Sequence, residues 1–155
     1  MSVTHPALQN TTFVSTHKTA PAWRVAAFAT AAAAIATEIV ATVGRAFGAS
    51  LEAGSIGART SERIPIGGFA TATLMCGAVG VLLVLAFARW ANRPERIYNV
   101  VALALTALSF LPSLAAGHTT GGTKVTLCLG HVVAAAIIIP VVSARLSRIE
   151  RPSVQ

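Results

Sequence analysis

Four long segments that carry almost no charge limit what this chain can fold into. They run from Val25 to Gly44, Ile64 to Ala88, Ile97 to Thr123 and Val125 to Ala144, and the one charged residue inside them is Glu38. A helix needs about 20 mostly apolar residues to cross the hydrocarbon core of a bilayer, and each segment meets this length. Period-two alternation is missing and the segments are too long for barrel strands. We therefore predict an all-α protein, a bundle of four transmembrane helices in antiparallel up-down order, with no strands. The predicted helices span about 23–47, 65–90, 97–116 and 123–145.

Composition agrees with a membrane setting. The chain is 54% hydrophobic and 11% charged, whereas soluble domains carry roughly 25% charged residues to cover their surface. A net charge of +7 could indicate binding to nucleic acid, but these cations flank the apolar runs, where they face lipid headgroups. We therefore expect a lipid bilayer as a partner and no nucleic acid.

The domain organisation follows from the same pattern. Residues 1–21 are polar and rich in Thr and have no helical periodicity, so we expect a flexible tail. Residues 22–146 form the transmembrane domain, and residues 147–155 form a second tail. The two cysteines, Cys76 and Cys128, lie inside apolar segments without a CxxC or zinc spacing. No motif indicates a metal or cofactor, so we expect neither.

The distribution of Lys and Arg sets the expected orientation, because cytoplasmic loops of membrane proteins are richer in cations. The side that holds both termini and the turn between the second and third helices has eight cations, and the other side has four. We therefore place both termini in the cytoplasm and the protein in the plasma membrane. Three aromatic side chains are expected at the cytoplasmic interface, namely Trp23, Trp90 and Tyr98.

Glu38 and His131 are the candidate catalytic residues. A carboxylate within a membrane helix is costly and by default suggests a functional site. Glu38 precedes Arg45 by seven residues, and His131 follows Lys124 by seven, so both lie about 10 Å inside the same end of the bundle. The first and last helices of an up-down bundle are neighbours. A hydrogen bond between Glu38 and His131 is therefore expected.

Other polar groups reach this outer layer and are candidate ligand-binding residues. They are Arg45 on the first helix, Thr71 and Thr73 on the second, and Ser109 on the third. Small residues at four-residue spacing, such as Gly44 with Gly48 and Cys76 with Gly80, predict close contacts between helices.

Four elements in the last two thirds of the chain carry a family resemblance. They are an Arg-rich turn after the second helix and the segments Leu108–Pro112, Leu127–Val132 and Ile139–Pro140. This part resembles an uncharacterised actinobacterial family of small four-helix integral membrane proteins, a domain of unknown function. The resemblance implies the four-helix topology and supplies no activity. It singles out Ser109, Pro112 and His131.

Three functions are compatible with these features. An accessory or structural membrane protein would use the buried polar layer to fix helix packing and would bind lipid or a partner membrane protein. A membrane enzyme would use Glu38 and His131 as an acid/base pair on a hydrophobic small molecule. A proton-coupled transporter of small molecules would use Glu38 as its carboxylate and could act as a homo-oligomer. We rank the accessory protein first, because no catalytic motif is present.

Overall fold

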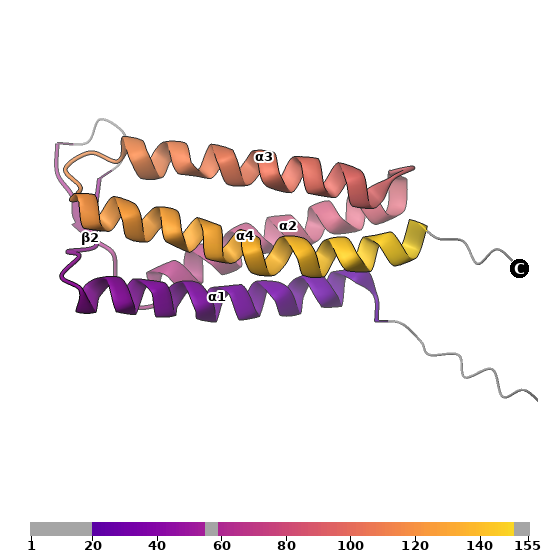
Figure 1. The fold of residues 1–155 in the computed structure, drawn as a ribbon, viewed down its shortest axis with the longest axis horizontal. Coiled ribbons are helices and arrows are strands. Elements are labelled where there is room, and N and C mark those ends of the chain that lie inside the picture. The colour runs from indigo at the N-terminus through magenta and orange to yellow at the C-terminus, as the bar shows by residue number, and fades with distance from the viewer. Residues whose placement is uncertain (1–19, 55–58, 151–155) are drawn as a thin grey trace, which may run out of the picture.

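A computed structural model describes residues 20–54 and 59–150, which contain four long helices. These are α1 (Ala22–Ala46), α2 (Gly68–Trp90), α3 (Pro94–Ala115) and α4 (Gly121–Glu150). All four are long and apolar enough to cross a membrane, and successive helices run in opposite directions (Figure 1). The predicted all-α bundle of four long helices is confirmed, and all four are candidate membrane spans.

The helix ends differ from the predicted bounds by a few residues. α3 begins earlier than expected, at Pro94, because the first turn of a helix tolerates proline, which lacks an N–H. α4 continues to Glu150, into the segment expected to be a tail. The remainder of that tail and most of the expected N-terminal tail, residues 1–19, lie outside the described residues.

The helices pack unequally around the bundle. α1 contacts α2 and α4 along its length and α3 packs on α4, whereas α2 and α3 contact each other at few positions. The expected contact between the first and last helices is therefore present. Because the turn that links α2 to α3 is short, the two helices start close together at that turn and then diverge (Figure 1).

Two glycines allow α1 to approach its neighbours closely. A Cβ atom added at Gly77 of α2 would overlap the Thr30 side chain of α1, and one at Gly44 of α1 would lie 2.7 Å from Thr126 of α4. Small residues of this kind let helix backbones approach in a membrane protein. Gly80 is different, since an added Cβ would meet no atom within 4 Å.

Clusters of buried apolar residues lie toward both ends of the bundle. We call the end with residue 22, the α2–α3 turn and the end of α4 the terminal end, and the opposite one the loop end (Figure 1). At the terminal end Tyr98 is buried with Val84, Val142 and Leu146. Tyr98 is only 6% exposed, so it belongs to the core, whereas Trp23 and Trp90 are 44% and 80% exposed.

The loop end contains a short β-ribbon that the sequence analysis did not predict. β1 (Glu52–Ala53) pairs antiparallel with β2 (Glu62–Arg63). Just before β1, Leu51 is fully buried and its φ is 47°. Its backbone N–H donates to the Thr123 hydroxyl of α4 over 3.1 Å, which ties the ribbon to the bundle. Strands of two residues have no periodicity to detect, so the expectation of no strands was wrong here.

Candidate functional site

Glu38 binds the beginning of α2. One carboxylate oxygen accepts a hydrogen bond from the Gly67 N–H at 2.9 Å, and the other accepts one from the Ala70 N–H at 3.2 Å. The first turn of a helix has N–H groups without partners within the helix, and they favour a negative charge. No side chain of α2 caps its own N-terminus. Glu38 of α1 therefore caps the N-terminus of α2.

Arg45 completes this arrangement from the end of α1. Its Nη1 lies 3.4 Å from a Glu38 oxygen, and its Nη2 donates to the carbonyl oxygens of Ile64 and Pro65 at 3.4 and 3.1 Å. The Glu38 side chain is 20% exposed and that of Arg45 is 26% exposed. We call these two side chains and the backbone groups that they bind the loop-end network. It joins α1 to the segment that enters α2 and neutralises the Glu38 charge.

The expected hydrogen bond between Glu38 and His131 is not present. The residue before Glu38, Thr37, is the one that points into the bundle: it is 2% exposed, and its hydroxyl lies 3.0 Å from that of Thr73. Successive residues of a helix are about 100° apart, so Glu38 faces outward between α1 and α2. There it lines a shallow groove with residues such as Ile35 and Leu74.

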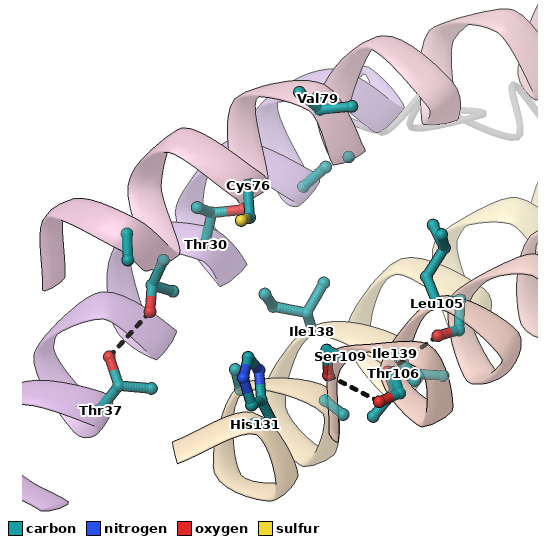
Figure 2. A pocket seen from close by; sticks show the side chains of 18 of the residues that line it. Thr30, Thr37, Cys76, Val79, Leu105, Thr106, Ser109, His131, Ile138 and Ile139 are labelled. Carbon is teal, nitrogen blue, oxygen red and sulfur yellow. Dashed lines mark hydrogen bonds between the residues drawn. The ribbon is translucent and has the colours of Figure 1, made fainter. Parts of the chain in front are cut away.

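His131 instead lines a large cleft between α2 and α3. The cleft has a volume of about 610 Å³, and residues of α1 and α4 close it from behind. Its lining is mainly apolar, from Phe69 near the loop end to Tyr98 near the terminal end. Figure 2 shows Thr30 and Cys76 on one wall and His131 on the other, with its ring directed into the gap.

Two hydroxyl groups that line the cleft from α3 have partners within their own helix. Ser109 donates to the Thr106 carbonyl at 2.6 Å, and Thr106 donates to the Ala102 carbonyl at 2.8 Å (Figure 2). His131 packs edge-on against Phe110, with 6.1 Å between ring centroids. Its imidazole makes no hydrogen bond to any other residue in the part of the chain that the structure describes. It is thus able to bind a polar group that enters the cleft.

A second polar chain joins α3 to α4 near the terminal end. Asn99 donates to the Ser143 hydroxyl at 3.0 Å, and that hydroxyl donates to Glu95 at 3.2 Å. The sequence analysis missed these residues, although Asn99 is a polar residue within an apolar segment. Within residues 20–54 and 59–150, no three His, Cys, Asp or Glu side chains gather at a place where they could hold a metal ion.

Comparison with protein families identifies the chain. The model of a family of unknown function, DUF6069, matches residues 17–148, which include α1, α2, α3 and nearly all of α4. The chain belongs to the DUF6069 family. Searches of curated proteins and of solved structures gave no match. The expected membership of a membrane family without a known activity is therefore supported by the match and by four candidate membrane spans.

The structure separates the predicted site residues of this DUF6069 protein into three places. Thr73 and Ser109 line the cleft with His131. Arg45 and Glu38 form the loop-end network. Thr71 is exposed on α2 and lines neither cavity. The cleft also includes polar residues that the sequence analysis did not single out, such as Thr30, Thr37 and Thr106.

Proposed function

We propose that this DUF6069 protein is an accessory integral membrane protein in which the loop-end network is structural. One observation carries the proposal: both carboxylate oxygens of Glu38 are bound by donors, namely two backbone N–H groups and the Arg45 guanidinium. A charge within an apolar helix costs free energy unless it is paired and hydrogen-bonded. Glu38 meets both conditions, and its partners belong to the segment that begins α2.

The proposal includes the setting in the plasma membrane with both termini in the cytoplasm. It is supported by the arginines of the terminal end, which on the described helices include Arg24, Arg89, Arg96 and Arg148. At the loop end Arg45 is held in the network, which leaves fewer cations there to face lipid headgroups. The positive-inside rule therefore favours the terminal end as cytoplasmic. The actinobacterial affiliation that the resemblance implies stays a prediction.

The two alternatives require a different arrangement of the same residues. An acid/base pair needs Glu38 and His131 to reach one substrate, but they line different cavities. A proton-coupled transporter needs Glu38 to leave its donors during each cycle, which would release the beginning of α2. The structural role needs neither rearrangement, and we rank it first.

Native mass spectrometry tests the proposal on the full-length protein in mild detergent. Wild type is compared with Glu38→Gln and with His131→Ala, and bound molecules and resistance to heating are recorded. We expect Glu38→Gln to unfold at a lower temperature while it retains the same bound molecules as wild type, because a neutral amide cannot accept from both N–H groups. A small molecule that wild type retains and both variants lose would overturn the structural role and favour the acid/base pair.

A further inference from the structure

The size of the cleft between α2 and α3 limits what can occupy it. Its volume of about 610 Å³ lies within the range of about 300–1,000 Å³ that is common for small-molecule sites. A transmembrane helix, taken as a cylinder 10 Å wide and 30 Å long, needs about 2,400 Å³. The cleft therefore has room for one elongated molecule and not for a helix of another chain.

The mouth of the cleft lies on the side of the bundle that faces lipid. Val79 of α2 and Leu105 of α3 both line the cleft, yet they are 58% and 50% exposed. They are therefore at the rim, where α2 and α3 have few contacts to close the gap. Because both helices are candidate membrane spans, a molecule dissolved in the hydrocarbon core can enter sideways.

The chemistry of the lining selects the kind of molecule. Among the described residues, no Lys, Arg, Asp or Glu lines the cleft. A charged head group would therefore have no counter-ion from this part of the chain, in apolar surroundings where an unpaired charge is strongly disfavoured. A pure hydrocarbon would leave the His131 imidazole without a hydrogen bond. A neutral molecule with one hydrogen-bonding group satisfies both conditions, since a neutral imidazole can accept from a hydroxyl or donate to a carbonyl.

We infer that the cleft binds a neutral lipophile from the bilayer, a single elongated apolar chain that carries one hydroxyl or carbonyl group. The polar group bonds to His131, and the chain lies along α2 beside Gly80, where the absence of a side chain leaves open space. This site is separate from the loop-end network, so its test uses no variant of Glu38 and its outcome does not depend on the proposed function.

Photolabelling of the reconstituted protein tests the site. Full-length protein in phosphatidylcholine vesicles is irradiated with a hexadecanol that carries a diazirine in its chain, and the labelled peptides are mapped by mass spectrometry. We expect label to concentrate on residues that line the cleft and to be displaced by excess unlabelled hexadecanol. Label spread evenly over the lipid-facing surfaces, without displacement, would overturn the site. This experiment uses only the wild-type protein.

Two variants on α2 make the test specific. Gly80→Leu fills the cleft, whereas Ala78→Leu places a leucine side chain at an exposed position outside it. We expect Gly80→Leu to lower labelling at least about fivefold, because the leucine side chain would occupy the space that the probe needs and would overpack the cleft when the probe is bound. Ala78→Leu should label like wild type. Equal labelling of the two variants would contradict the site.

The role of His131 is tested with a pair of probes. In His131→Phe, which keeps an aromatic ring, apparent affinity for the hexadecanol probe should fall roughly two- to tenfold, the range for one lost hydrogen bond. Affinity for the matching hexadecane probe, which has no hydroxyl, should not change. An equal change for both probes would show that His131 acts only through packing and would overturn the proposed hydrogen bond.

Discussion

Replacing Glu38 with Ala is expected to lower the free energy of unfolding by about 3 kcal/mol, because hydrogen bonds to a charged group contribute roughly 1.5–3 kcal/mol each. The change removes the partner of the Gly67 and Ala70 N–H groups and leaves Arg45 without its carboxylate. The two backbone hydrogen bonds alone sum to about 3–6 kcal/mol, and we take the lower end of that range because the Glu38 side chain is 20% exposed. Unfolding by SDS in mixed micelles, followed by circular dichroism, measures the difference.

Thr42→Ala is the matched control for this prediction. Thr42 lies one turn after Glu38, is exposed, and its hydroxyl donates to the Glu38 backbone carbonyl within the same helix. Its replacement should change stability by less than about 0.5 kcal/mol, as is usual at surface positions. A similarly small effect of Glu38→Ala would mean that the loop-end network contributes little to the fold.

Replacing Gly77 with Leu is expected to destabilise the bundle by about 3 kcal/mol, at the upper end of the range for overpacking. Even the first added atom, Cβ, would overlap Thr30 of α1, so α1 and α2 would have to separate along their contact. The same SDS titration measures the loss.

A double variant tests whether the Thr30 side chain causes this loss. Gly77→Ala alone should also lose stability, and the double variant Thr30→Ala with Gly77→Ala should recover part of it, because overlapping side-chain atoms of Thr30 are removed.

Gly80→Leu provides the control on the same helix. Gly80 lies almost one turn after Gly77, and an added Cβ there meets no atom within 4 Å. Leucine also favours helix over glycine by up to about 1 kcal/mol, so we expect Gly80→Leu to be neutral or slightly stabilising. If both glycine variants lose the same stability, the close approach of α1 and α2 at Gly77 is not the cause.

The number and approximate length of the helices could be predicted because a bilayer requires long apolar spans, and charges such as Arg45 and Arg89 mark the ends of α1 and α2. The faces of the helices could not be predicted in the same way. Large apolar side chains point to the outside as well as the inside, as Phe28 and Met75 show with 76% and 70% exposure. Without a polar outer face, the sequence does not reveal which sides of α2 and α3 turn away from each other.

The partners of Glu38 were missed for a related reason. Its depth and its distance from His131 along the bundle axis could be estimated, but not the rotation of α1, because small apolar residues were not expected to mark the inward face of this helix. In the structure the small residues Ala33, Thr37 and Ala41 turn inward, which directs Glu38 toward α2. Its donors are backbone N–H groups of Gly67 and Ala70, which leave no mark in a sequence.

Amide signals of the beginning of α2 provide the most direct test of the structural role of Glu38. NMR spectra of isotope-labelled wild type and Glu38→Gln in micelles report the hydrogen bonds of Gly67 and Ala70 and the state of the His131 ring. We predict that both amide signals shift and their hydrogens exchange faster in Glu38→Gln, while the His131 signals keep their positions. Unchanged Gly67 and Ala70 amides together with shifted His131 ring signals would contradict the network and support a Glu38–His131 pair.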